Sequence, residues 1–269
     1  ENIMMKKLKK ISPKKRTRIF VHNEIVKKIF IKSKFCKDNQ ISVIGPIRVD
    51  RLLKYKPKKI NNKKKNILFY LFGSGTLIDT DITYGREMSV DPNYGWYNLI
   101  INTYKIIISK AKNYPNHNFI FKTKFASKYF LDLHNKMTKK YKLHNIRLMT
   151  NEKNYSLLKK ADLVISFGST TILESLMLDK SVLVPFFDEV KIKKYQDFIP
   201  FKELINSEIA GKSKKNFDNK LDAFLKNKIK LKLPNRVKKN LLIRYLNTDR
   251  LPNTKKLSKT IETIINIHK

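Results

Sequence analysis

The sequence predicts an α/β protein with a Rossmann-like doubly wound parallel sheet and a helical C-terminal tail. Short apolar runs rich in β-branched and aromatic residues alternate with longer amphipathic segments, which is typical of parallel βαβ units with right-handed crossovers. One such unit carries a Gly-Ser-Thr-Thr turn between its strand and its helix. With 269 residues and 41% hydrophobic content, the chain can fill the core of one large domain or two small ones.

The first 55 residues predict the end of one α/β unit. They contain two short strand candidates, 18–21 and 41–44, separated by a helix that Asn23 can cap. A polar, Lys-rich stretch that contains Pro57 follows at residues 56–65, and this composition is typical of a linker. We therefore interpret residues 1–55 as the remnant of an N-terminal α/β domain. Because the chain does not begin with Met, we expect further sequence upstream.

Beyond the linker the alternation of strand and helix is regular. Five strands are predicted, at residues 66–72, 117–122, 146–149, 162–167 and 181–187. The helices between and after them are expected at residues 96–112, 126–141, 154–160, 216–227, 234–246 and 253–267, with one more between the last two strands. We assign residues 66–250 to one doubly wound domain and residues 251–269 to a C-terminal helix.

The clearest βαβ unit spans residues 161–187. Between its first strand and its helix lie a glycine, three hydroxyl residues suited to cap a helix and an early carboxylate: Gly168, Ser169, Thr170, Thr171 and Glu174. The backbone N–H groups at such a helix start, the helix dipole and the hydroxyl groups together favour an anion, typically a phosphate. The alternative is an ordinary capped unit that binds nothing.

Ligands of doubly wound sheets bind at the carboxyl ends of the strands. Three loops at this edge carry the glycines, hydroxyl groups and lysines that suit a phosphate. They contribute Gly73, Ser74 and Gly75 after the first strand, Lys122 and Lys124 after the second, and Gly168 to Thr171 after the fourth. Their convergence on one edge predicts a ligand that bears phosphate groups.

The connection over residues 73–95 is long for a βα loop, which suggests a functional loop or lid. Its charged residues Arg86, Glu87 and Asp91, together with His22 at the end of an earlier strand, are candidate catalytic residues. The alternative is a solvated loop kept soluble by its acidic residues. The loop that contains Tyr195, after the last predicted strand, is expected to bend back over the site, and Trp96 to anchor its helix in the core.

The formal net charge of +37 suggests a nucleic-acid-binding protein, but Lys greatly outnumbers Arg, which is the preferred residue for bidentate phosphate and base contacts. Nucleic acid is therefore not the expected partner. A basic surface also attracts anionic lipid head groups, so a peripheral membrane contact is a further hypothesis. Scattered histidines and a single cysteine predict no metal site and fit a reducing, cytoplasmic compartment.

Four segments together resemble B-type glycosyltransferases, and more narrowly bacterial surface-carbohydrate and capsule polysaccharide proteins related to CDP-glycerol glycerophosphotransferases. They are the Gly-Pro-Ile-Arg-Val-Asp segment at residues 45–50, the strand at 66–72, the strand and basic loop at 119–124, and the stretch at 161–185. The segment at 45–50 looks like the one that closes the N-terminal domain in that family. The resemblance covers residues 17 to 250.

This resemblance implies the C-terminal half of a two-domain enzyme that transfers a sugar or glycerophosphate from a nucleotide-activated donor to a glycan or lipid-linked acceptor. Gly168, Ser169, Thr170 and Thr171 would bind the donor phosphates, Glu174 would bind the ribose or sugar, and Lys122 and Lys124 would stabilise the leaving group. The resemblance implies no metal or other cofactor besides the nucleotide donor. Related capsule enzymes often have His-Pro where this chain has Thr123-Lys124. A sugar-nucleotide epimerase of the same architecture is the alternative enzyme.

Overall fold

The computed structural model describes residues 18–55, 64–76, 78, 93–123, 128–150, 152–248 and 252–267. These residues form two compact units, each described by itself below. One unit combines the beginning of the chain, up to residue 56, with its end, from Pro234 onward; the other contains the intervening residues, 57–233.

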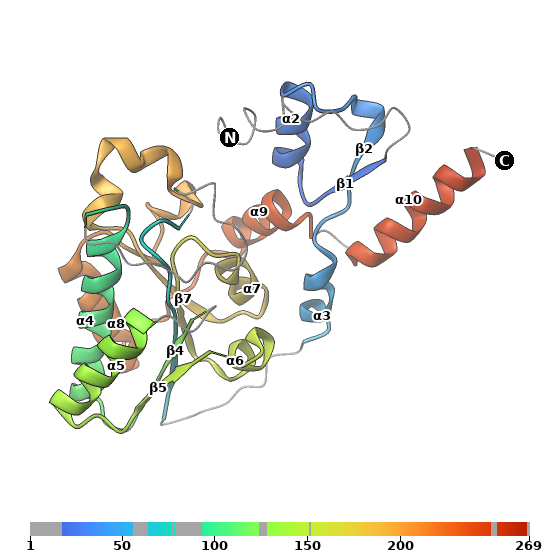
Figure 1. Ribbon diagram of the computed structural model, residues 1–269. Coiled ribbons are helices and arrows are strands. Elements are labelled where there is room, and N and C mark those ends of the chain that lie inside the picture. Colours follow the sequence, from blue (N-terminus) through green and yellow to red (C-terminus); the bar gives the residue numbers. More distant parts are fainter. Residues whose placement is uncertain are drawn as a thin grey trace. The chain divides into compact units, whose positions relative to one another are not determined.

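The larger unit is built on a sheet of six parallel strands (Figure 1). In chain order these are β3 (Asn66–Tyr70), β4 (Asn118–Lys122), β5 (Ile146–Met149), β6 (Leu163–Ile165), β7 (Ser181–Pro185) and β8 (Ala210–Gly211). Their order across the sheet is β5-β4-β3-β6-β7-β8, with every neighbouring pair parallel. This confirms the predicted doubly wound sheet. Strand β8 was missed, because two residues are too short to show any periodicity.

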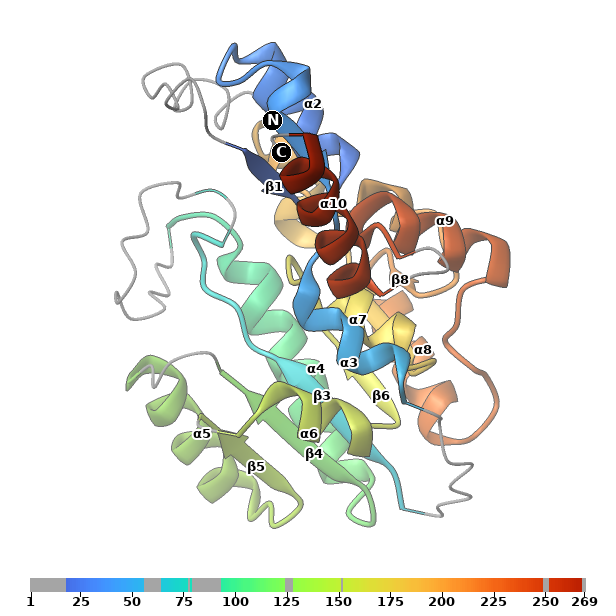
Figure 2. The same ribbon diagram turned by 90° about the vertical axis from the view of Figure 1, so that its right-hand side faces the viewer.

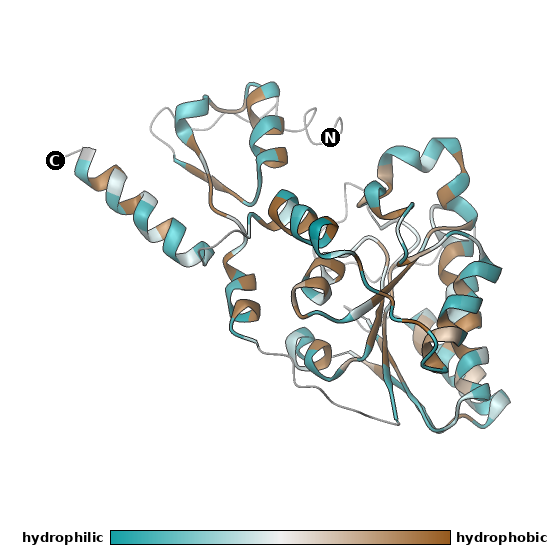
Figure 3. Ribbon diagram, turned by 180° about the vertical axis from the view of Figure 1, so that it is seen from behind, coloured by the Kyte–Doolittle hydropathy of each residue, from teal (hydrophilic) through white to brown (hydrophobic). Residues whose placement is uncertain are grey.

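Helices cover both faces of this sheet (Figures 1 and 2). One face carries α4 (Tyr97–Asn113), α5 (Lys128–Tyr141) and α8 (Lys214–Leu225), and the other carries α6 (Asn154–Lys160) and α7 (Thr171–Met177). Three short 3₁₀ turns lie between β7 and β8: η3 (Asp188–Lys191), η4 (Lys193–Phe198) and η5 (Lys202–Leu204). The central strands are hydrophobic along their length (Figure 3), because both of their faces are buried.

The register of the sheet decides which side chains share a face. Phe69 contacts Phe121 edge to face, with ring centroids 5.6 Å apart, and Phe121 in turn packs on Tyr104 of α4. Since successive residues of a strand point to opposite faces, Tyr70 and its register partner Lys122 point to the face that α6 and α7 cover. These two polar residues end β3 and β4, so they lie at the carboxyl edge.

The smaller unit contains a two-stranded parallel sheet of β1 (Ile19–Val21) and β2 (Ile41–Val43). Between these strands lie α2 (Glu24–Lys32), which the Asn23 side chain caps, and η1 (Asp38–Gln40). After them come η2 (Ile47–Val49), α3 (Asp50–Leu53) and the two helices from the end of the chain, α9 (Asn235–Leu246) and α10 (Asn253–Ile267). The βαβ arrangement of β1, α2 and β2 has the strand-helix-strand order predicted for this part of the chain.

The last two helices belong to this smaller unit, so the boundary at residue 250 that we drew from the sequence differs from the structure, which places it before Pro234. The Asn23 amide donates to the carbonyl of Tyr245 at 2.9 Å, and the Asn247 amide donates to the carbonyl of Val43 at 3.3 Å. These long-range hydrogen bonds hold α9 against β1, β2 and α2. Sequence periodicity detects the helix but carries no information about such partners.

The predicted linker, 56–65, falls largely outside the described residues, but its last residue was assigned wrongly. Lys65 is only 8% exposed. Its ammonium group donates to the carbonyl of Phe224 at 2.8 Å and lies 4.2 Å from the centre of the Phe224 ring. Lys65 is therefore part of the larger unit, where a hydrogen bond and a cation–π contact compensate for its burial.

Candidate functional site

The strand order identifies one position in the larger unit where a ligand is expected. The chain leaves β3 toward β4 and β5 on one side, and leaves β6 toward β7 and β8 on the other. The reversal between β3 and β6 is the topological switch point of the sheet. In open α/β sheets, ligands bind outside the carboxyl ends of the strands at this point. Two of the loops predicted from the sequence, after β3 and after β6, lie there.

The loop after β3 is fixed by its own hydrogen bonds. The Gly73 amide donates to the Thr76 hydroxyl at 3.0 Å, and the backbone amide of Trp96 donates to the carbonyl of Ser74 at 3.0 Å. Gly95 has a φ of +66°, and a Cβ atom there would lie 2.0 Å from the Ser74 carbonyl oxygen. Only glycine fits this approach. Gly73, Ser74 and Gly75 are buried, so their backbone forms a fixed wall of the edge.

The loop after β6 uses its hydroxyl groups differently from the prediction. Thr170 is the N-cap of α7 but makes no side-chain capping bond. Ser169 caps the helix instead. The Ser169 hydroxyl oxygen accepts from the Thr171 amide at 3.2 Å, and the Ser169 carbonyl accepts from the Ile172 amide at 3.1 Å. Those two amides therefore have acceptors within the protein. Gly168, with a φ of +69°, and Ser169 are half-buried, while Thr170 is exposed.

Lys122 lies at the carboxyl edge, as predicted, and its ammonium group is already engaged. It donates to the carbonyls of Thr123 at 2.5 Å and Thr150 at 2.6 Å, which joins the ends of β4 and β5. Lys122 is 6% exposed, and this burial lowers the pKa of its ammonium group, against the opposing effect of the Glu152 charge. Two of the three N–H donors of the ammonium group are thus used inside the protein.

The start of α4 holds an anion supplied by the protein itself. The carboxylate of Glu189, in η3, accepts from the backbone amides of Asn98 at 2.7 Å and Leu99 at 2.8 Å. Glu189 is only 6% exposed. In dinucleotide-binding sheets a pyrophosphate lies at the start of the helix after the first strand. In this chain the Glu189 carboxylate lies at the start of the helix that follows β3. Sequence reasoning missed Glu189, although it closely follows the last predicted strand.

The loop after β7 reaches back to the same edge, as expected. The Tyr195 hydroxyl oxygen accepts from the Gly95 amide at 3.1 Å, and its ring lies 5.3 Å from that of Trp96. Trp96 is fully buried, as predicted, and packs on Phe167, two residues after the end of β6, with ring centroids 5.0 Å apart. These contacts tie the loops after β3, β6 and β7 into one structure.

Glu174 and Tyr70 add two buried polar groups below this edge. Glu174, on α7, was predicted from its sequence position and is 8% exposed. Tyr70, at the end of β3, is also 8% exposed and was not predicted to be functional. Burial and the charge of Glu174 both raise the pKa of Tyr70, so its hydroxyl stays protonated. The only feature of the sequence that could have marked Tyr70 is its polar phenol group at the end of an otherwise apolar strand.

The remaining predicted residues lie outside the described residues or in the smaller unit. Lys124, Arg86, Glu87 and Asp91 lie outside the described residues. His22 is exposed and belongs to the smaller unit, where partial burial and the positive charge of Arg48 lower its pKa. Within the described part of the chain, no three or more His, Cys, Asp or Glu residues are grouped so that they could hold a metal ion. The same part contains no helix long and apolar enough to cross a membrane.

Comparison with solved structures shows which fold this is. UDP-GlcNAc 2-epimerase of Methanocaldococcus jannaschii has a TM-score of 0.54 at 14% identity, over 92% of this chain and 61% of that one. The wall teichoic acid polymerase TagF has a TM-score of 0.53 at 13% identity, over 99% and 61%. MnaA of S. aureus, solved with UDP, has a TM-score of 0.53 at 12% identity, over 92% and 59%. No model of a protein family matches the sequence, and no curated protein matches it.

The chain thus has the fold of the B-type glycosyltransferases, in agreement with the resemblance seen in its sequence. It spans about three fifths of the length of these structures. At such low identity the likeness concerns the fold alone, and the similar structures include both polymerases and epimerases.

Proposed function

We propose that this protein transfers a sugar or glycerophosphate from a nucleotide-activated donor to a glycan or lipid-linked acceptor in bacterial surface polysaccharide biosynthesis. The observation that supports it best is the sheet order, whose switch point carries the Gly73–Gly75 loop on one side and the Gly168–Thr171 loop on the other. The fold it shares with TagF, which was also solved after a soak with CDPG, supports the same class of donor.

In this proposal the donor diphosphate lies against the loop after β6. Gly168, Ser169 and Thr170 are its accessible part, at the positive end of α7. Glu189 occupies the start of α4, so a second anion there would be repelled. Glu174 would accept a hydrogen bond from a hydroxyl of the ribose or the transferred group. Lys122 and Lys124 would place positive charge near the leaving phosphate.

The catalytic base is not assigned by this proposal. Of the catalytic candidates from the sequence, His22, Glu87 and Asp91 have side chains that can accept a proton, whereas Arg86 stays protonated and is a candidate for charge stabilisation only. The lowered pKa of His22 favours its neutral imidazole. A neutral imidazole can accept a proton from an acceptor hydroxyl. Each candidate is tested by its alanine variant once transfer is measured.

Ligand-induced stabilisation tests the donor class. A ligand that binds only the folded state raises the melting temperature in proportion to its affinity and concentration. We expect one among UDP-, CMP-, CDP- and GDP-linked ligands to stabilise the protein, with the free diphosphate giving a large share of the effect. If none of them raises the melting temperature of the full chain at millimolar concentration, the proposal is wrong.

The second candidate is a UDP-GlcNAc 2-epimerase, because two of the similar structures are such enzymes. Epimerisation needs acidic and basic side chains for proton transfer at the sugar. The structure describes two buried carboxylates at this edge, those of Glu174 and Glu189, and the Glu189 carboxylate is already bound to two backbone amides of α4. Incubation with UDP-GlcNAc alone distinguishes the candidates. An epimerase changes the sugar without an acceptor, whereas a transferase leaves it unchanged until an acceptor is added.

A further inference from the structure

Three buried polar side chains gather at the carboxyl edge on the face that α6 and α7 cover. Tyr70 comes from β3, Lys122 from β4 and Glu174 from α7, and they are 8%, 6% and 8% exposed. Tyr70 and Lys122 are partners in the sheet register, so their side chains leave the sheet on the same side. Burial, and after it the charge of Glu174, raises the pKa of the Tyr70 hydroxyl.

Tyr70 differs from its two neighbours in one respect. Lys122 is bound to two carbonyls, whereas the Tyr70 hydroxyl is buried and has no hydrogen-bond partner in the described structure. Buried polar groups of native proteins are nearly always hydrogen-bonded, and a phenol in a core usually finds a partner. An unpartnered hydroxyl at the topological switch point is therefore suited to a ligand group.

We propose that the Tyr70 hydroxyl donates a hydrogen bond to a ribose hydroxyl of the nucleotide donor, beside Glu174. This inference rests on the proposed function and adds a binding residue to it. An ionised carboxylate can only accept hydrogen bonds, whereas a protonated phenol donates one. Glu174, on α7, and Tyr70, at the end of β3, thus supply an acceptor and a donor at the same edge of the sheet. A ribose hydroxyl, which both donates and accepts, is complementary to this pair, and a phosphate oxygen is not.

The structure offers a matched control for the test. Tyr104, on α4, is 1% exposed, and its hydroxyl also has no hydrogen-bond partner among the described residues. Its ring packs on Phe121, on the opposite face of the sheet from Tyr70. Tyr70→Phe and Tyr104→Phe each remove one buried, unpartnered hydroxyl and keep the ring, so both variants should melt at or slightly above the wild-type temperature.

The experiment is calorimetric titration of the full chain and both variants with the nucleoside diphosphate that stabilises the wild type most. We expect Tyr70→Phe to bind about tenfold more weakly and Tyr104→Phe to bind like the wild type. The 2′-deoxy and 3′-deoxy forms of the nucleotide give a second measurement. One of them should bind the wild type more weakly than the parent nucleotide, and Tyr70→Phe should have lost that preference.

Equal affinity of Tyr70→Phe and the wild type would overturn the inference while leaving the proposed function in place. An equal loss in both tyrosine variants, or an undiminished ribose preference in Tyr70→Phe, would also overturn it, since the effect would then not come from a contact with ribose. If the wild type itself binds no nucleotide, the proposed function fails first and this inference with it.

Discussion

The carboxylate of Asp50 accepts a hydrogen bond from the backbone amide of Asn253, 2.8 Å away in space and 203 residues away in sequence. The same carboxylate accepts from the amide and the hydroxyl of Thr254, each at 2.7 Å. Asp50 therefore caps the start of α10 from another part of the chain. Gly45 belongs to the same contact, because a Cβ atom there would lie 2.5 Å from the Asn253 side chain.

Asp50→Ala should loosen α10 from the smaller unit. The substitution removes the acceptor of two backbone amides at a helix start, where loss of a capping group costs about 1–2 kcal/mol. Amide hydrogen exchange over residues 252–267 should accelerate, while exchange in β3 to β7 should not change. Asp38→Ala is the control, because Asp38 makes an exposed ion pair with Lys27, and such pairs contribute little. Unchanged exchange in α10 would show that the cap is dispensable.

Glu189→Gln should destabilise the larger unit and loosen the start of α4. The neutral amide offers one acceptor oxygen in place of two and loses the attraction to the helix dipole. With two charge-assisted hydrogen bonds affected, we expect a loss of about 2 kcal/mol in the free energy of unfolding. Urea titration measures it, with the exposed Glu208→Gln as control. If Glu189→Gln is as stable as the wild type, Glu189 does not hold α4.

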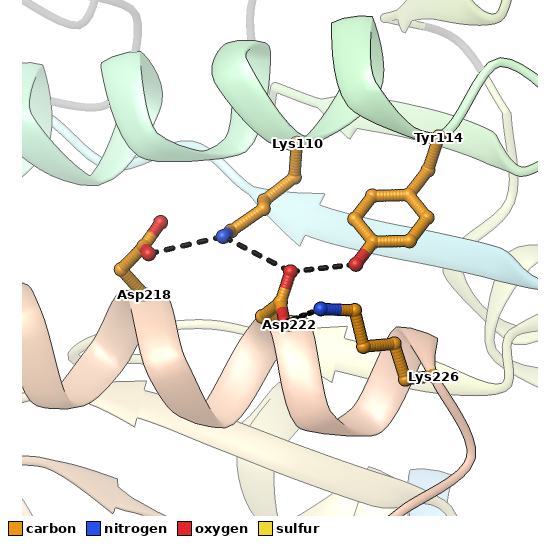
Figure 4. Close-up of polar contacts among 5 residues, drawn as sticks. All are labelled: Lys110, Tyr114, Asp218, Asp222 and Lys226. Atoms are coloured by element: carbon orange, nitrogen blue, oxygen red, sulfur yellow. Dashed lines mark hydrogen bonds and ion pairs between the residues drawn. The ribbon is translucent and has the colours of Figure 1, made fainter.

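Asp222 gives the stability a defined dependence on pH. Its carboxylate accepts from Tyr114 at 2.6 Å and forms ion pairs with Lys226 at 2.7 Å and Lys110 at 3.3 Å, joining α8 to α4 (Figure 4). The hydrogen bonds from Lys226 and Tyr114 hold the pKa of Asp222 well below its usual value. This stabilisation is complete above the unfolded pKa of about 3.9 and is lost as the pH falls toward the folded pKa.

The variant Asp222→Asn should therefore be less stable than the wild type at pH 7, and the difference should shrink below pH 4. Removing the carboxylate leaves Lys110, which is 7% exposed, with Asp218 alone as its described acidic partner. Chemical unfolding at pH 7, 5 and 3 measures the difference, and Lys226→Ala, which removes an exposed partner, should have the smaller effect at pH 7. A difference that stays constant from pH 7 to pH 3 would contradict the assignment.

Ser169→Ala and Thr170→Ala should act differently. Ser169 caps the Thr171 amide, so its loss should cost about 1 kcal/mol of stability and also weaken nucleotide binding. Thr170 is exposed and makes no side-chain cap, so its loss should weaken binding with little change in stability. The double variant should keep the fold and bind nucleotide least. Titration with nucleotide and thermal melting separate the two effects, and unchanged affinity in the double variant would return this loop to a structural role.

The fold class and most of the elements could be predicted from the order of the residues alone. Periodicity of apolar residues located β5 and α6 at their observed bounds and the other strands of the larger unit except β8 within a few residues. The glycines and hydroxyl groups at residues 73–75 and 168–171 marked the two loops that flank the switch point. These features are local, because strand burial, helix period and turn chemistry are each encoded within a few neighbouring residues.

The contacts between these elements came from the folded chain. It assigned α9 and α10 to the unit of β1 and β2, through Asn23 and Asp50. It placed Glu189 on the start of α4 and gave the capping role to Ser169. It also left the Tyr70 hydroxyl without a hydrogen-bond partner among the residues that the structure describes. Each of these outcomes depends on atoms brought together from distant parts of the chain or on burial from both sides of the sheet. Contacts between distant residues leave no pattern in the neighbouring sequence, so they cannot be predicted from periodicity or turn chemistry.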